Sequence, residues 1–233
     1  HTTHLAQFLQ RPDDALTAAT LWVEEEPNST EANSTMASLL AQQGRVLEAL
    51  HYLAAAEQHG GNANFPILLS GFSKLKDQQR KDLLAGINKL SAQYPKNIQL
   101  LLTHALVYTE YEQLDEALAE LQKLLELEPQ QPQAVLLEAR ILVEQKAKQP
   151  YARLQQLLQE RPENSKLRMQ YARMLAVTDM KAAREQFEIL SAEAPQDGDL
   201  LFSLALISGE IGDREAARNY LQQTVALGQR NDD

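Results

Sequence analysis

Histidine is the side chain that most often performs acid–base chemistry or binds a metal, and this chain of 233 residues has five. His51 and His59 lie eight residues apart, whereas two histidines that bind one metal from a single helix are four apart. His104 is expected to pack against a neighbouring helix, and His1 and His4 are assigned no role. The histidines therefore indicate no metal site and no general base.

The acidic residues and the nucleophiles indicate no catalytic site either. The run Glu24-Glu25-Glu26 is predicted at the end of a helix, whereas calcium requires a loop that surrounds the ion with oxygen ligands. The chain has no cysteine, which excludes disulfides, thiolate zinc sites and cysteine nucleophiles. The sequence contains no glycine-rich phosphate loop and no ordered set of Ser, His and Asp. We expect no enzyme activity, no cofactor and no metal.

Arginine gives a chemical signal with a regular spacing. Arg140 and Arg173 lie 33 residues apart, with Lys166 between them. A guanidinium binds a carboxylate through two parallel hydrogen bonds. The chain itself is acidic, with a net charge of −10, so these residues favour an acidic protein group over nucleic acid, which requires clustered Lys and Arg. The alternative is that the two arginines pair with Glu138, Glu144 or other neighbouring acids.

The same spacing recurs in the prolines. Five of them stand at Pro27, Pro95, Pro129, Pro162 and Pro195. Their intervals are 68, 34, 33 and 33 residues, and glycines occupy the two positions, 61 and 228, where a further proline would continue the series. Because proline interrupts helices, this period indicates an internal repeat.

Small residues recur with the same period and predict where two helices cross at close range. They are Ala37, Gly71, Ala105, Ala139, Ala172 and Ala205. Apolar residues recur around them at the spacing of one helix face. The sequence therefore predicts an all-α chain of six helix–turn–helix repeats, preceded by a partial repeat (1–29) with its second helix at 13–25 and followed by a tail (230–233). The six repeats span 30–63, 64–97, 98–131, 132–164, 165–197 and 198–229.

The pattern resembles the tetratricopeptide repeat, a helix–turn–helix unit of 34 residues with two small residues at fixed positions and a terminal proline. The resemblance covers nearly the whole chain, although the aromatic residue usual near the start of each repeat is mostly missing. It implies a right-handed α–α superhelix, or solenoid, in which the first helix of each repeat lines a concave groove. It also implies that a protein or peptide partner binds in that groove.

The resemblance assigns particular positions of each first helix to the groove. Those positions form an apolar track followed by basic residues, and exposed apolar surface usually marks a partner site. The alternative is that packing buries part of this track. The predicted partner-binding residues are Phe65, Leu68, Phe72, Leu102, Leu106, Leu136, Arg140, Lys166, Met169, Arg173 and Phe202.

We therefore expect a scaffold or adaptor that binds another protein, binds no nucleic acid and performs no chemistry. No run of 18 apolar residues occurs, so no membrane span is predicted. The chain starts inside a predicted helix and ends soon after Gly228, and we expect it to be a fragment of a longer repeat array. The alternative is a structural module that forms a homodimer through its terminal helices.

A narrower similarity concerns the segments Ala15–Pro27 and Leu200–Gly228. They are similar to gammaproteobacterial tetratricopeptide lipoproteins of the outer membrane, some of which are adaptors for a periplasmic carboxy-terminal processing protease. This similarity implies a periplasmic chain that assembles the protease or delivers its substrates. The cytoplasm is the alternative compartment.

Overall fold

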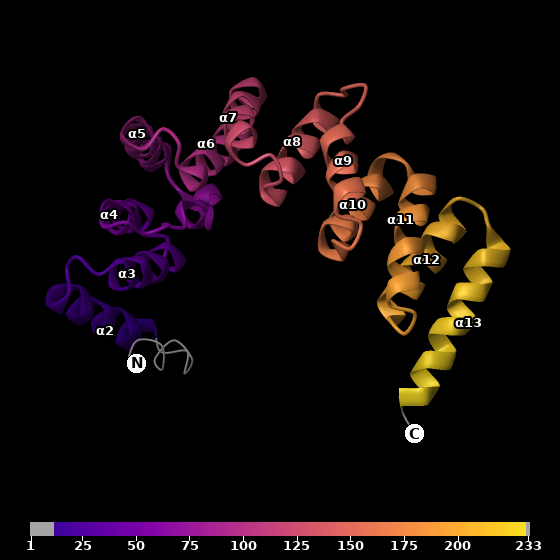
Figure 1. Ribbon diagram of the computed structural model, residues 1–233. Coiled ribbons are helices and arrows are strands. Elements are labelled where there is room, and N and C mark those ends of the chain that lie inside the picture. Colours follow the sequence, from indigo (N-terminus) through magenta and orange to yellow (C-terminus); the bar gives the residue numbers. More distant parts are fainter. Residues whose placement is uncertain (1–11, 232–233) are drawn as a thin grey trace. The chain divides into compact units, whose positions relative to one another are not determined.

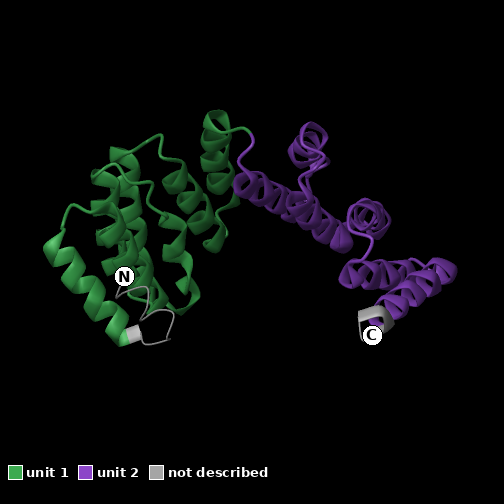
Figure 2. Cartoon of the chain, turned by 60° about the horizontal axis from the view of Figure 1, so that its bottom comes forward, with its two compact units in different colours: residues 1–129 green, residues 130–233 purple. Residues whose placement is uncertain are grey.

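The computed structural model describes residues 12–231, where all regular secondary structure is helical (Figure 1). The all-α prediction is confirmed. The chain divides into unit 1, residues 1–129, and unit 2, residues 130–233, which Figure 2 shows in two colours. Residues 1–10, predicted as the tail of the first helix of the partial repeat, lie outside the described residues, as do His1 and His4 within them.

Helical hairpins build both units. Unit 1 contains α2 (Pro12–Glu25), α3 (Thr30–Gln42), α4 (Val46–Gln58), the 3-10 helices η1 (Phe65–Leu69) and η2 (Phe72–Lys74), α5 (Asp77–Gln93), α6 (Ile98–Glu110) and α7 (Leu114–Leu127). Unit 2 contains α8 (Pro132–Glu144), α9 (Ala152–Glu160), α10 (Ser165–Thr178), α11 (Met180–Glu193), α12 (Gly198–Glu210) and α13 (Arg214–Asn231). Helices α3, α6, α8, α10 and α12 begin at the first residues of five predicted repeats. Helix α13 continues through Asn231, so the tail predicted at 230–233 starts within a helix.

A recurrent turn ends one repeat and starts the next. The residue before a proline avoids the helical conformation, so the proline stops the second helix. Two residues after each of the five prolines, a polar side chain accepts a hydrogen bond from a backbone N–H in the first turn of the next helix. These capping residues are Ser29, Asn97, Gln131, Asn164 and Asp197. The period seen in the sequence is therefore the period of this proline-and-cap turn.

The second repeat, 64–97, departs from the prediction in its first half. The sequence predicts one helix with Gly71 at a helix crossing, but the chain forms η1 and η2 instead. Gly71 adopts a φ of +114°, a left-handed conformation that interrupts a right-handed helix. Helix α5 holds the short segment in place, because Arg80 Nη2 donates to the carbonyl oxygen of Ser73 (3.0 Å) and its guanidinium lies 5.3 Å from the ring centroid of Phe72.

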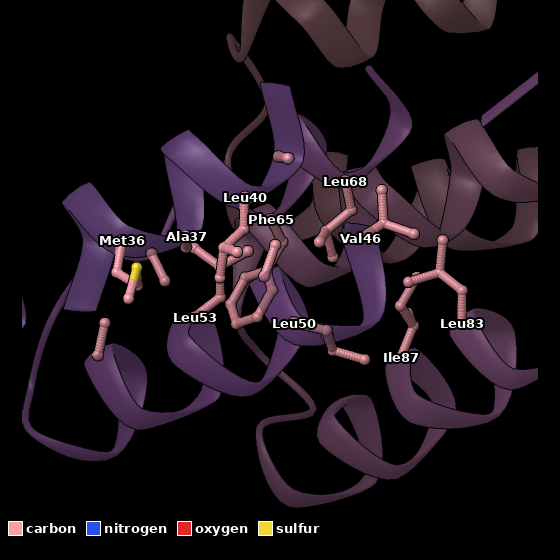
Figure 3. Packing of buried hydrophobic residues seen from close by; sticks show 14 of the residues in the cluster. Met36, Ala37, Leu40, Val46, Leu50, Leu53, Phe65, Leu68, Leu83 and Ile87 are labelled. Carbon is pink, nitrogen blue, oxygen red and sulfur yellow. The ribbon is translucent and has the colours of Figure 1, made fainter. Parts of the chain in front are cut away.

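The core of unit 1 forms where this short segment meets the helices. Phe65 and Leu68 of η1 are fully buried. Figure 3 shows them among Leu40, Leu53 and Ile87, in one cluster that also includes the crossing residue Ala37. Burial of such side chains contributes about 1.5–3 kcal/mol each. The two 3-10 helices thus replace a predicted helix without leaving the neighbouring hairpins unpacked.

The hairpin of α10 and α11 in unit 2 has the shortest connection among the described helices. Asp179 alone separates them. Its Oδ1 accepts hydrogen bonds from the backbone N–H groups of Lys181 and Ala182, both at 3.1 Å. One residue therefore ends the first helix and caps the second.

The other hairpin turns supply a prediction about stability. Gly44 and Gly212 adopt φ values of +75° and +84° at the end of their first helices, whereas the corresponding turns use Glu112 (+58°) and Lys146 (+54°). A side chain in this left-handed conformation costs roughly 1 kcal/mol relative to glycine. Glu112→Gly and Lys146→Gly should therefore each raise the free energy of unfolding by roughly 1 kcal/mol, measured by urea denaturation.

A matched control lies next to one of these turns. Gln113 has a φ of −88°, where glycine brings no relief of strain and only adds freedom to the unfolded chain. Gln113→Gly should lower stability. A stability loss in Glu112→Gly as well would contradict the strain account.

A polar cluster around the buried His104 in unit 1 predicts a dependence on pH. His104 Nε2 lies 2.6 Å from Asn88 Oδ1, and its Nδ1 lies 3.8 Å from Glu120 Oε2, while Lys123 Nζ donates to Glu120 Oε1 at 2.8 Å. His104 and then Lys123 lower the pKa of Glu120 below its ordinary value of 4.5, against the opposing effect of burial. The charged carboxylate of Glu120 therefore stabilises the fold at pH values above 4.5. This contribution to stability is lost as the pH falls from 4.5 through the lowered pKa of Glu120.

Glu120→Gln should accordingly lower the urea midpoint at neutral pH, and the difference from the parent should shrink as the pH falls below 4.5. The exposed Glu116 of the same helix provides a charge-matched control as Glu116→Gln. A pH-independent difference for Glu120→Gln, or an equal loss in both variants, would show that the cluster does not favour the ionised carboxylate.

Candidate partner-binding surface

The structure buries the apolar track that the sequence predicts in unit 1. Phe65, Leu68, Phe72 and Leu102 are between 0 and 3% exposed, and Leu106 is half-buried. The first three lie on η1 and η2, whose short turns direct them into the core. The ring of Phe72 also packs edge-to-face against that of Tyr111, with 5.8 Å between the ring centroids. Leu102 lies on α6, which packs against η1, α5 and α7. The prediction that these four residues form an exposed track is therefore wrong.

The predicted residues of unit 2 keep access to solvent. They lie on the first helices α8, α10 and α12, at positions that repeat every 33 residues. One row consists of Leu136, Met169 and Phe202, of which the first two are half-buried and the third is 48% exposed. We call the accessible set the first-helix surface; it comprises Leu136, Arg140, Lys166, Met169, Arg173, Phe202 and Leu206.

The helices place these side chains in register. Lys166, Met169 and Arg173 are separated by three and four residues, so they lie along one side of α10. Met169 also packs against the cluster that contains Leu200 and Leu204 of α12, so the two helices share a core beneath the surface. The buried helix faces thus fix the positions of the exposed ones.

A second row on the same helices is mostly basic. It consists of Arg140, Arg173 and Leu206, all exposed, with Leu206 at 55%. The sequence places Leu206 at a groove position of the sixth repeat, but the predicted partner-binding residues do not include it. Its position 33 residues after Arg173 was the signal that could have identified it. Because Leu206 is apolar, it adds to the apolar surface around Phe202 and not to the basic surface of Arg140 and Arg173.

The two arginines have no acidic partner within the described part of the chain. Neither Arg140 nor Arg173 makes a hydrogen bond or ion pair there. Glu138, which the sequence offered as a partner for Arg140, accepts instead from Arg153 Nε of α9 at 2.9 Å. Both guanidinium groups are therefore available for a carboxylate from another molecule.

Within 12–231, no group of three or more His, Asp or Glu residues could hold a metal ion. No helix in this range is long and apolar enough to cross a membrane. What the first-helix surface can provide is apolar contact beside three exposed cations, Arg140, Lys166 and Arg173, an arrangement suited to a segment with apolar and acidic side chains.

Comparison with known sequences finds a partial relative, and no family model matches. A TPR repeat-containing protein of Pseudomonas aeruginosa, PA4667, is 30% identical over 114 residues, which make up 49% of this chain and 19% of that protein. The chain therefore matches about a fifth of the length of this relative.

Solved structures share the fold at low sequence identity. A tetratricopeptide repeat protein from Parabacteroides merdae has a TM-score of 0.58 and 16% identity, with 97% of this chain and 90% of that one covered. The protein TTC0263 of Thermus thermophilus has a TM-score of 0.53 and 22% identity, with coverages of 75% and 95%. MamA has a TM-score of 0.51 and 17% identity, with coverages of 69% and 88%.

Proposed function

Because the chain belongs to the tetratricopeptide repeat superfamily, we propose that it is a non-enzymatic scaffold whose first-helix surface binds a segment of another protein. Proteins of this superfamily generally mediate protein–protein interactions. The observation that carries the proposal is the pair Arg140 and Arg173, exposed and without a partner in the described chain, beside the apolar row of Leu136, Met169 and Phe202.

The chemistry of the surface defines the partner segment. An aspartate or glutamate would accept two hydrogen bonds from one of the arginines. Apolar side chains on the same segment would cover Phe202 and Leu206, which would otherwise face water. Arginine and aromatic anchors carry a large share of the energy at protein interfaces. The four buried residues of unit 1, Phe65, Leu68, Phe72 and Leu102, take no part in the proposed site, which lies on the first helices of unit 2.

The test is selection of short random peptides on the parent chain, followed by affinity measurements on variants. We expect the selected peptides to combine acidic and apolar residues. The double variant Arg140→Glu/Arg173→Glu should weaken their binding by about 100-fold, because it replaces attraction with repulsion. Helical content by circular dichroism should stay the same, since both side chains are exposed.

Arg218→Glu provides the control, because Arg218 is an exposed arginine of α13 outside the first-helix surface. It makes the same kind of charge change and should leave the affinity intact. Peptides that bind the double variant as tightly as the parent would remove the arginines from the site.

We also propose a setting for this scaffold: the periplasm, as part of an adaptor that assembles a carboxy-terminal processing protease or delivers its substrates. The similarity of Ala15–Pro27 and Leu200–Gly228 to such adaptors supports it, and a chain without cysteine suits an oxidising compartment. Cell fractionation of the native protein, with cross-linking to that protease, should place both in one periplasmic complex. Recovery in the cytoplasm would exclude this setting.

The alternative proposal, a homodimer, is supported by the exposed Leu221 and Val225 of the last helix, which are 45% and 60% accessible. Sedimentation equilibrium decides between the two. A dimer that dissociates on Leu221→Glu would favour the structural module, whereas a monomer would exclude it.

A further inference from the structure

A groove runs along α9 in unit 2, apart from the first-helix surface. It consists of two adjoining recesses of about 400 and 380 Å³. Gln155 and Gln159 line both recesses, Arg168 and Gln186 line the first, and Lys148 lines the second. We call this continuous feature the α9 groove.

The groove lies on the other side of α10 from the first-helix surface. An α-helix turns about 100° per residue, so Arg168 points roughly 200° away from Lys166 around the helix axis. Tyr171 shares the Arg168 side and also lines the groove. Met169 and Arg173 lie on the Lys166 side. A ligand of the groove would therefore not compete for the residues of the first-helix surface.

Arg168 is a buried cation whose partners are all neutral. The residue is 8% exposed. Its Nη1 donates to Gln186 Oε1 at 2.9 Å and its Nη2 donates to the carbonyl oxygen of Pro162 at 3.0 Å, while the buried Nε has no partner in the described chain. A buried charge without a counterion is unfavourable. The groove is thus built around a positive charge that the described residues do not neutralise.

The other repeats show that the fold does not require this charge. At the same position they place the buried residues Leu101, Val135 and Leu201. In the first complete repeat Asn33 stands there, and its Nδ2 donates to the carbonyl oxygen of Pro27 at 2.9 Å, the bond that Arg168 makes to Pro162. A neutral asparagine therefore suffices for the structural hydrogen bond. A structural role therefore explains the hydrogen bond from Arg168 to Pro162, but it does not explain why the residue at this position carries a charge.

The walls of the groove are suited to a peptide backbone. A glutamine amide both donates and accepts, so a row of glutamines can bind the C=O and N–H groups of an extended chain. Gln155 Nε2 donates to the hydroxyl oxygen of Tyr171 at 2.8 Å, which leaves the phenol hydrogen for a ligand. Among the described residues, no Asp or Glu lines either recess, in a chain whose net charge is −10.

We propose that the α9 groove binds an extended acidic segment of a partner protein, with its backbone on the glutamine row and a side-chain carboxylate on Arg168. The second cation, Lys148, attracts a further acidic residue of the same segment at the second recess. A phosphate ion would match the charge of Arg168 but would leave the glutamine row without partners.

The experiment uses the full chain carrying Arg140→Glu/Arg173→Glu, so that the first-helix surface cannot bind the probe. The probe is a short fluorescein-labelled polyglutamate peptide, and polyglutamine of equal length is its neutral counterpart. We expect polyglutamate to bind and to shift the side-chain amide NMR signals of Gln155 and Gln159. Arg168→Asn should weaken binding by about tenfold or more, because a charged hydrogen bond is lost.

Two variants distinguish a loss of binding from a loss of folding. Arg168→Asn reproduces the residue that the first complete repeat already uses, and circular dichroism should show an intact helical chain. Gln159→Glu changes an exposed residue and should abolish polyglutamate binding through repulsion. Equal affinity in Arg168→Asn and its parent, equal binding of polyglutamine, or complete displacement by an equimolar amount of inorganic phosphate would each overturn the proposal. The Arg140 and Arg173 changes are common to every variant, so failure here says nothing against the first-helix surface.

Discussion

Close packing of paired helices at alanine is the interaction on which the rest of the structure depends. Ala37, Ala105 and Ala172 of the first helices and Ala49 and Ala117 of the second helices are fully buried. A larger side chain at such a crossing would separate the helices and open the core beneath them. Because these contacts connect only neighbouring helices, each hairpin keeps an outer side on which the sequence can vary without loss of the fold.

Much of the repeat could be predicted because its signals are local. A proline and the polar residue two positions later, such as Pro162 and Asn164, act on the adjacent turns of the chain alone. The first half of the repeat 64–97 could not be predicted by counting positions, because Gly71 fits both a helix crossing and a left-handed turn. Only the contacts that Arg80 of α5 makes with Phe72 and Ser73 distinguish the two.

The site was less accessible to prediction because it depends on contacts distant in sequence. Assigning Phe65 and Leu68 to a groove assumed a helix that the chain does not form. Arg140 is left without an acidic partner because Glu138 accepts a hydrogen bond from Arg153, a residue on the next helix. Arg168 gave a usable signal, since it stands where Leu101 and Val135 are apolar, but the sequence alone could not show that its charge stays without a counterion.

The single residue between α10 and α11 has a mechanical consequence. Asp179 donates its own N–H to the carbonyl oxygen of Leu175, and its side chain accepts from the backbone N–H groups of Lys181 and Ala182, so the connection is held to both helices. Tension applied to α10 is transmitted directly to α11. Since α10 carries residues of both the first-helix surface and the α9 groove, the placement of this one helix sets the placement of both.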